Sequence, residues 1–280
     1  MPVSWLSTQS VSNVPLAVCA TPIGNLDDVT LRLLEELRSA DVILCEDTRH
    51  TRVLLDRHGI SGARLLSYHE HNEAKRTAEL LPRLEAGERV ALVSDAGMPG
   101  ISDPGARLVE AALDREVPVT VLPGPTAVET ALVASGFAAD RYHFVGFLPR
   151  RAGALASLWR ELAGWTDPVV AFESPQRLPA TLRSLAELLP GREVAVCREL
   201  TKKFEEVVRG SAAEVAARFV DPPKGEITVV LGPGREERDV AGALEAVAEL
   251  VAAGVPRRRA ADVVSRLTGT SRNELYRRTL

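Results

Sequence analysis

The sequence is poor in aromatic and cysteine residues and has no long hydrophobic run. Aromatic residues make up 4% of the 280 residues, so the chain lacks an interleaved aromatic platform on which nucleotide bases could stack. Its apolar runs are shorter than the roughly 18–20 residues that span a bilayer, so we expect no membrane association. Each of the three cysteines lies within a short apolar run (LAVCA, VILCED, VAVCRE), which predicts buried thiols and a cytoplasmic protein.

The signals of several other protein classes are also missing. The opening MPVSWLSTQSVSNVP has neither a basic end nor a long apolar stretch, so residues 1–13 are interpreted as a tail and not as a secretory signal. No GxGxxG or GxxxxGK(S/T) stretch occurs, so the fingerprints of dinucleotide and triphosphate sites are lacking. His69 and His71 could face the same side of a strand, but no further ligands follow at recognisable spacing. We therefore expect no metal.

Positive charge is concentrated near the C-terminal end of an otherwise acidic chain. The formal net charge is -4, which excludes a protein that is basic throughout. Residues 255–280 nevertheless hold seven arginines against only Asp262 and Glu274, so a local patch could contact nucleic-acid phosphates. A solvated helical surface is the alternative interpretation. The candidate phosphate-binding residues are Lys203, Arg257, Arg258, Arg259, Arg272 and Arg277.

Short apolar runs alternate with helical patterns between residues 14 and 234. Runs that are apolar at nearly every position are typical of strands covered on both faces, and strand–helix alternation predicts a parallel sheet covered by helices. Strands are expected at 16–20, 42–47, 64–69, 89–95 and 118–124, and in a second set at 142–148, 168–174, 192–199 and 226–232. The sequence LPGP at 122–125 marks a junction. We therefore predict an α/β fold with one α/β domain at 14–124, a second at 125–234, and a cleft between them.

Helical patterns fill the intervals and continue beyond the second domain. The segment 30–39 is expected to direct Leu31, Leu34 and Leu37 to one side. Further helices are expected at 103–115, at 126–135, after the capping-box sequence SAAE at 211–214, near 239–253, after Pro256, and after the capping-box sequence SRNE at 271–274. The TGT break at 268–270 makes residues 235–280 resemble a small basic helix-turn-helix module.

Three unusual loops follow expected strands. They are ATPIGN at 20–25, SDAGMPGISDPG at 94–105 and LPGPTA at 122–127. Ligands bind beyond the carboxyl ends of the strands in open parallel sheets, and glycines let the backbone come close to a ligand. Each loop alone is weak evidence, because glycine and proline often only make turns.

Together and in order, these loops are similar to the tetrapyrrole methylase superfamily over most of residues 16–233. Within it, CEDTRHT at 45–51, FESPQR at 172–177 and CRELTKKFEE at 197–206 resemble the branch of 16S ribosomal RNA (cytidine-2′-O-)-methyltransferases. The resemblance implies S-adenosylmethionine as cofactor, bound between two α/β domains. It also implies a homodimer, and as substrate a cytidine in the decoding region of the small ribosomal subunit.

The site residues are predicted from these loops and from polar groups at strand ends. The cofactor is expected to contact Thr21, Pro22, Ile23, Gly24, Asp95, Ala96, Gly97, Met98, Ile101, Ser102, Thr126, Ala127, Phe172, Glu173, Ser174, Ile227 and Thr228. The candidates for catalysis are Glu46, Asp47, Arg49 and Lys202, because a ribose hydroxyl needs a general base or a stabilising cation. Asp95, Glu173 and Glu199 are further candidate bases, because they also lie near expected strand ends. The alternatives are an ordinary carboxylate–arginine pair that orients a loop and a lysine that only solvates the surface.

Two other functions fit the same pattern. A tetrapyrrole C-methyltransferase would use the same fold on a macrocycle, because a fold does not fix the substrate. A ligand-sensing regulator without catalysis would use the C-terminal module to read duplex bases. The basic module argues against the macrocycle, and the carboxylates expected at the cleft argue against the regulator.

Overall fold

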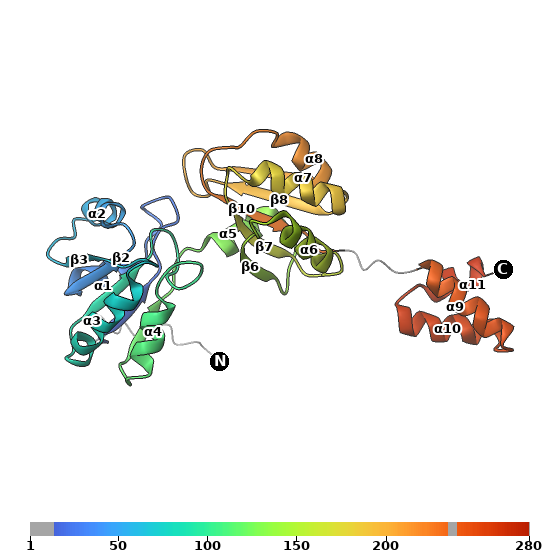
Figure 1. The fold of residues 1–280 in the computed structure, drawn as a ribbon, viewed down its shortest axis with the longest axis horizontal. Helices are drawn as coiled ribbons and strands as arrows, with labels where there is room; N and C mark the ends of the chain where they lie inside the picture. The colour runs from blue at the N-terminus through green and yellow to red at the C-terminus, as the bar shows by residue number, and fades with distance from the viewer. Residues whose placement is uncertain (1–13, 235–239, 280) are drawn as a thin grey trace, which may run out of the picture. The chain divides into compact units, whose positions relative to one another are not determined.

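The computed structural model describes residues 14–234 and 240–279. The chain divides into an α/β unit, which ends at Pro233 and contains both sheets, and a helical unit formed by residues from Gly234 onward together with Arg160–Thr166. Figure 1 shows the elements of each unit.

The first sheet is parallel throughout, as predicted. Its strand order is β3 (Arg64–Ser67), β2 (Val42–Cys45), β4 (Val90–Val93), β1 (Leu16–Cys19), β5 (Val119–Leu122). The predicted strands have the right centres, and each is one to three residues longer than the observed strand. This topology places β1 between β4 and β5, so the loops that follow these three strands leave the sheet side by side.

Helices cover both faces of the first sheet. α1 (Leu31–Ser39) and α2 (Thr48–Arg57) pack on one face, and α3 (Glu73–Glu85) and α4 (Ala106–Leu113) pack on the other. The predicted apolar side of α1 is correct for Leu34 and Leu37, which pack against the core. It is wrong for Leu31, which is 80% exposed, and it missed Leu33, which is buried. Positions 33 and 37 are one helical turn apart and face the sheet together, whereas position 31 points away from it.

The second sheet is mixed, so the prediction of parallel strands is wrong for this half. Its order is β6 (His143–Phe147), β7 (Val169–Glu173), β10 (Ile227–Leu231), β8 (Glu193–Arg198), β9 (Glu206–Ser211). Only β6 and β7 are parallel, and β10 runs antiparallel to both β7 and β8. The sequence analysis missed β9, which pairs antiparallel with β8. Its sequence EVVRGS carries charges, as edge strands commonly do.

Four helices belong to the second sheet. They are α5 (Ala127–Ser135), α6 (Ala152–Leu162), α7 (Leu178–Leu188) and α8 (Ala212–Arg218). Ala131 of α5 packs with Val170, Cys197 and Val230 from three strands, and α7 packs against α8. The capping box predicted at Ser211 is present at the start of α8, which satisfies two amides that the helix leaves unpaired.

The helical unit contains α9 (Val240–Ala252), α10 (Arg257–Thr268) and α11 (Arg272–Arg278). They have a core of their own, formed by Ala243, Val247, Ala260, Ala261, Val264 and Leu275. Gly269 ends α10 with a φ of 67°, which glycine adopts without steric cost. The capping box predicted at Ser271 is wrong, because that side chain makes no cap hydrogen bond.

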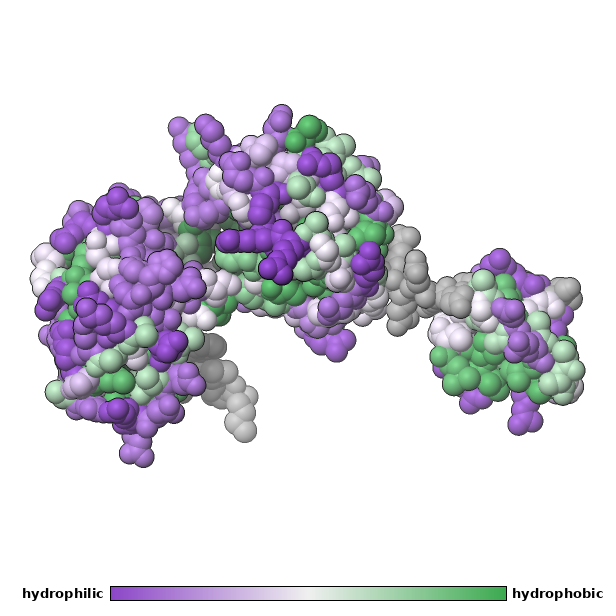
Figure 2. Space-filling view, in the orientation of Figure 1, coloured by the Kyte–Doolittle hydropathy of each residue, from purple (hydrophilic) through white to green (hydrophobic). Residues whose placement is uncertain are grey.

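Burial agrees with the composition of the chain. The three cysteines are buried, as predicted, and burial raises the pKa of Cys197 to about 11. Figure 2 shows mainly hydrophilic residues on the visible face of the first sheet and its helices. Among the described residues, no helix has the length and apolar character that a membrane span requires.

Candidate active site

The loops after β1, β4 and β5 are joined to one another by backbone contacts. Thr21 N–H donates to Gly97 O at 2.9 Å, and Gly97 N–H donates back to Thr21 O at 3.2 Å. The Thr21 hydroxyl also donates to Ser94 O at 3.0 Å. A Cβ on Gly124 would lie 2.9 Å from the Cβ of Ala20, so the third loop lies directly against the end of β1. The three loops predicted from sequence therefore form one surface.

The first loop also contacts the segment between β8 and β9. A Cβ on Gly24 would lie 2.5 Å from Lys202 Cγ and 2.9 Å from Leu200 O, so only glycine fits there without displacing its neighbours. Asn25 N–H donates to the Thr201 hydroxyl at 3.0 Å, and Ile23 is buried in a cluster that includes Leu200. The loop ATPIGN is thus the contact through which both sheets contribute to one site.

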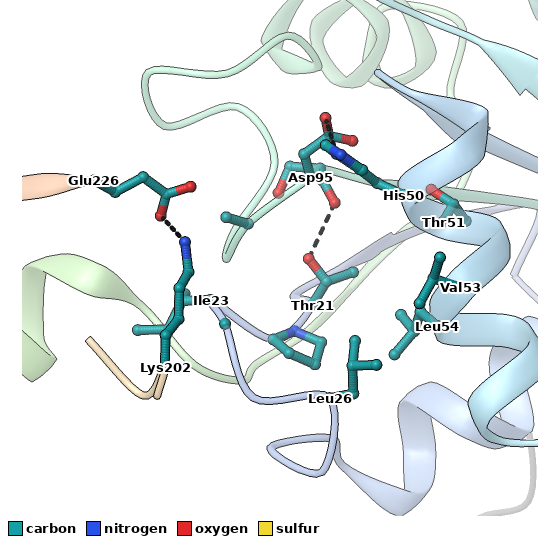
Figure 3. Close-up of a pocket in the computed structure, with 14 residues that line it drawn as sticks. Thr21, Ile23, Leu26, His50, Thr51, Val53, Leu54, Asp95, Lys202 and Glu226 are labelled. Atoms are coloured by element: carbon teal, nitrogen blue, oxygen red, sulfur yellow. Dashed lines mark hydrogen bonds and ion pairs between the residues drawn. The ribbon is translucent and has the colours of Figure 1, made fainter. Parts of the chain in front are cut away.

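These loops enclose a pocket of about 320 Å³ (Figure 3). Its walls are residues 21–24 and Leu26 of the first loop, His50, Thr51, Val53 and Leu54 of α2, residues 94–96 after β4, and Lys202 and Glu226 from the second half of the chain. Apolar side chains from the first loop and α2 face carboxylates and cations from the other segments, and this combination is typical of small-molecule sites.

Asp95 joins the loop after β4 to the start of α2. Its Oδ1 accepts from Asp47 N–H at 3.1 Å, and its Oδ2 lies 3.2 Å from Nδ1 of His50. Asp47 caps α2 by accepting from Arg49 N–H at 2.8 Å. The Arg49 guanidinium also donates to both Asp47 oxygens, and these bonds lower the pKa of Asp47. Asp47 is therefore a weak base that organises the helix start.

Two carboxyls near Asp95 have raised pKa values. Burial, followed by the charges of Asp103 and Asp95, raises the pKa of Glu46 to about 7. Burial, followed by the charge of Asp95, raises the pKa of Asp103 to about 6. Glu46 Oε1 is buried, and no other described residue gives it a hydrogen bond. Carboxylates held close together in a partly buried place oppose one another's ionisation, which raises their pKa values. The sequence analysis had not selected Asp103.

Lys202 is held between two carboxylates. Its Nζ lies 3.2 Å from Glu199 Oε1 and 3.0 Å from Glu226 Oε2. Burial lowers the pKa of Lys202, but hydrogen bonds and charge from Glu226 and Glu199 outweigh burial and raise it overall. Glu199 and Thr201 both adopt positive φ angles, 52° and 65°. Such backbone is uncommon outside glycine and is found at functional sites, and here it directs a fixed cation at the pocket.

The predicted cofactor residues fall into two groups. Thr21, Pro22, Ile23, Gly24, Asp95 and Ala96 line the pocket. The others do not line it. In the first half of the chain, Met98 packs against the core under α3 and α4, Gly97 forms hydrogen bonds with Thr21, and Ile101 and Ser102 are exposed. Thr126 caps α5 next to Ala127. In the second half, Phe172 meets Phe144 edge to face, Ile227 and Thr228 are buried in β10, and Ser174 N–H donates to Glu173. For this second group, cofactor contact stays a prediction.

Glu173 is occupied by its own corner of the fold. Its carboxylate accepts from Ser174 N–H at 2.6 Å, from the Thr181 hydroxyl at 2.5 Å and from the Arg177 guanidinium at 2.9 Å. The side chain is 0% exposed. These contacts join β7 to α7 and leave the group as a structural anchor.

The predicted catalytic residues are also separated by the structure. Among them only Lys202 lines the pocket. Asp47 is hydrogen-bonded through its backbone N–H to Asp95, which does line the pocket, and Arg49 is an exposed partner of Asp47. Sequence reasoning missed His50 and Glu226. His50 follows Asp47 by three residues on α2, so both lie on one helix face, and this spacing within CEDTRHT was a signal that could have identified it.

The candidate phosphate-binding residues differ in their partners. Arg257 lies 4.6 Å from the centre of the Tyr276 ring and donates to Tyr276 O and the Thr279 hydroxyl. Arg272 lies 3.8 Å from Asp262, and Lys203 lies over the ring of Phe204. Arg258, Arg259 and Arg277 make no ion pair with another described residue. RNA contact by all six stays a prediction.

Family models match nearly the whole chain. The model described as tetrapyrrole (corrin/porphyrin) methylases matches residues 15–216. The chain belongs to this family. A second model, described as the RsmI C-terminal HTH domain, matches residues 238–280, the segment in which the sequence predicted a helix-turn-helix. The protein is therefore a methyltransferase with an added helical module.

Curated relatives and a solved structure agree with this family. The chain is 44% identical to the ribosomal RNA small subunit methyltransferase I of Mesorhizobium japonicum, over 95% of this chain and 91% of that protein. It is 48% identical to the protein of the same name from Thermotoga maritima, over 79% of this chain and 99% of that protein. Uroporphyrin-III C-methyl transferase from Thermus thermophilus, complexed with S-adenyl homocysteine, has the same fold, with a TM-score of 0.54, 21% identity, and coverage of 78% of this chain and 96% of that one.

Proposed function

We propose that this methyltransferase transfers the methyl group of S-adenosylmethionine to the ribose 2′-hydroxyl of a cytidine in the decoding region of 16S ribosomal RNA. The observation that carries the proposal is the identity of 44% over 95% of the chain to a ribosomal RNA small subunit methyltransferase. That identity spans both the methylase core and the C-terminal module. The branch sequences CEDTRHT and CRELTKKFEE supply walls of the pocket.

The pocket has the chemistry that S-adenosylmethionine requires. The cofactor is positively charged at its sulfonium and amino groups, and Asp95 and Glu226 supply carboxylates to the pocket walls. Ile23, Val53 and Leu54 supply apolar surface for its less polar parts. Residues 21–24 and 94–96 would hold it through side chains and backbone. When bound, it supplies a methyl group already activated for transfer.

The task left to the protein's own residues is to position the ribose hydroxyl relative to the methyl group. Placing a hydroxyl oxygen in line with the methyl carbon accounts for roughly 7–11 kcal/mol of barrier reduction in well-oriented reactions. The loop after β1 and the fixed Lys202 cation border the same pocket. Lys202 is suited to hold an RNA phosphate or to stabilise negative charge on the ribose oxygen, because its ion pairs keep it protonated.

The partners follow from the same resemblance. The arginines of α10 and α11 would bind RNA phosphates of the small ribosomal subunit, with Arg258, Arg259 and Arg277 the most available. We extend the proposal to a homodimer that acts in the cytoplasm. Buried free cysteines in the α/β unit suit a reducing compartment.

The alternative of tetrapyrrole C-methylation has less support. The uroporphyrin enzyme shares the fold at 21% identity. Identity at this level indicates a common fold and does not indicate a common substrate. The segment 238–280 matches the RsmI C-terminal HTH domain. An enzyme that acts on a free macrocycle needs no such basic helical module. The methylase match also argues against a regulator without catalysis.

A labelling assay tests the proposal. The protein is incubated with methyl-labelled S-adenosylmethionine and, in separate reactions, with unmethylated small ribosomal subunits, naked 16S RNA or a porphyrinoid precursor. We expect label in RNA, on a ribose oxygen after nuclease digestion. Label in the macrocycle alone would replace this function with the alternative, and label on an RNA base would retain the substrate but contradict the 2′-hydroxyl.

A further inference from the structure

We propose that His50, oriented by Asp95, is the general base that accepts the proton of the ribose 2′-hydroxyl. This inference rests on the proposed function and adds to it a residue outside the candidates selected from sequence. It starts from the pocket itself, where His50 and Asp95 form part of one wall and contact each other (Figure 3).

Two independent contacts fix the orienting carboxylate. Asp95 Oδ1 accepts from Asp47 N–H at the start of α2, and Oδ2 lies 3.2 Å from His50 Nδ1. A carboxylate at Nδ1 favours the tautomer in which Nδ1 carries the hydrogen, so Nε2 keeps its lone pair. The His50 side chain is 70% exposed, and no described residue makes a hydrogen bond to Nε2. A proton acceptor at the pocket wall is therefore open to an incoming hydroxyl.

The other polar groups near the pocket are less suited to this task. Asp47 is bound by Arg49, which lowers its pKa and weakens it as a base. Lys202 is kept protonated by Glu199 and Glu226. Glu46 does not line the pocket, and its Oε1 is buried. His50 combines access, an available lone pair and an orienting partner, the arrangement found in aspartate–histidine–nucleophile systems.

The proposed step balances in atoms and charge. The 2′-hydroxyl proton moves to His50 Nε2 while the hydroxyl oxygen forms a bond to the methyl carbon. The carbon–sulfur bond breaks and its electron pair remains on sulfur, which becomes a neutral thioether. The imidazolium, stabilised by Asp95, then releases the proton to water.

The test measures four variants in three assays. His50→Ala should lower the single-turnover rate of RNA methylation, measured at saturating S-adenosylmethionine, by about 10²- to 10⁴-fold, the usual contribution of a general base. Because His50 lines the pocket, calorimetric affinity for S-adenosylmethionine should also fall, but by much less than the rate. His50→Gln should be equally slow, because the amide can donate to Asp95 but cannot accept the proton. Added imidazole should restore part of the His50→Ala rate. In the cofactor-free protein, ring ¹⁵N shifts should report the Nδ1–H tautomer for His50 and lose it in Asp95→Asn.

The chain supplies a matched control. His143 Nε2 lies 3.3 Å from Asp167 in a second aspartate–histidine pair, and neither residue lines the pocket. His143→Ala should keep the wild-type rate and gain nothing from imidazole. A wild-type rate in His50→Gln, or a slow His50→Ala that imidazole does not rescue, would overturn the role of His50. Wild-type protein that fails to methylate RNA at all would instead contradict the proposed function.

Discussion

The two sheets contribute to the same pocket by different physical means. In the parallel sheet, the carboxyl ends of β1 and β4 lie next to each other, so backbone-rich loops at 21–24 and 94–96 form the wall. In the mixed sheet, the β8–β9 connection and the residue before β10 deliver Lys202 and Glu226. The first sheet thus supplies shape and hydrogen-bonding backbone, together with the Asp95–His50 pair. The second supplies charged side chains held by ion pairs and by backbone at positive φ.

The sheets also differ in where their ion pairs lie. Glu173 and Arg177 join β7 to α7 with the carboxylate fully buried. Asp27 and Arg57, beside the first sheet, form a pair of similar geometry at 2.8 Å with side chains that are 61% and 55% exposed. Water screens the second pair more than the first, in which Glu173 is buried and Arg177 is 27% exposed. The same chemistry should therefore contribute differently to stability.

The largest expected effect comes from breaking the buried pair. Glu173→Ala should lower the free energy of unfolding by about 3–5 kcal/mol, because it removes a buried carboxylate and leaves the Ser174 amide, the Thr181 hydroxyl and the Arg177 guanidinium without their acceptor. Asp27→Ala should cost only about 0–1 kcal/mol. Urea denaturation of both variants measures the difference. Equal losses would show that burial does not distinguish the two pairs.

A second prediction concerns the contact between the sheets' loops. Gly24→Ala places a Cβ 2.5 Å from Lys202 Cγ and 2.8 Å from the Thr201 hydroxyl. Such overpacking costs about 1–3 kcal/mol, and it should weaken S-adenosylmethionine binding because the pocket includes both Gly24 and Lys202. Gly191→Ala is the control, because its new Cβ would have no neighbour within 4 Å. Isothermal calorimetry should show weaker binding for Gly24→Ala alone.

The sequence predicted the architecture better than the chemistry of the site. Apolar runs identified nine of the ten strands in the described part of the chain, because a strand buried on both faces is apolar at nearly every position. β9 was missed because an edge strand such as EVVRGS carries charge like a loop. Strand direction in the second sheet could not be predicted from local pattern, since β8 and β9 are joined without a helix.

The site was predicted as a set of loops and not as a set of contacts. Residues 21–24 and Asp95 were found because glycine-containing loops follow strands. The Asp47 carboxylate is bound by Arg49 and does not face a ligand. The choice between these two orientations depends on side-chain geometry within residues 47–49, which loop composition does not encode. The raised pKa of Asp103 depends on burial and on Asp95, a residue eight positions away. Such properties require the folded arrangement.

A third prediction separates two kinds of arginine in the helical unit. Arg257→Ala should mainly destabilise this unit, by about 0.5–1 kcal/mol, because the guanidinium no longer lies over the Tyr276 ring. Arg258→Ala with Arg259→Ala should leave its stability unchanged and weaken RNA binding. The slope of log affinity against log salt should fall by about 0.7 for each phosphate of single-stranded RNA that the variant no longer neutralises. Filter binding at several salt concentrations and thermal melting measure both effects. A double variant with the wild-type slope would exclude these two arginines as phosphate ligands.

A fourth prediction concerns Glu46 and the pH dependence of stability. Its pKa is about 7 in the folded protein, against 4.5 for an ordinary glutamate. The folded state therefore binds more protons than the unfolded state between these values, and stability should fall as pH rises from 4.5 to about 7. Glu46→Gln should remove this part of the decline, measured by urea denaturation at several pH values. Asp103→Asn should lower the upper end of the pH range over which stability falls, because the charge of Asp103 helps to raise the pKa of Glu46. Carboxyl ¹³C NMR would show the pKa of Glu46 directly. A stability profile that is the same in the wild type and in Glu46→Gln would contradict the raised pKa and the clustering of carboxyls behind the pocket.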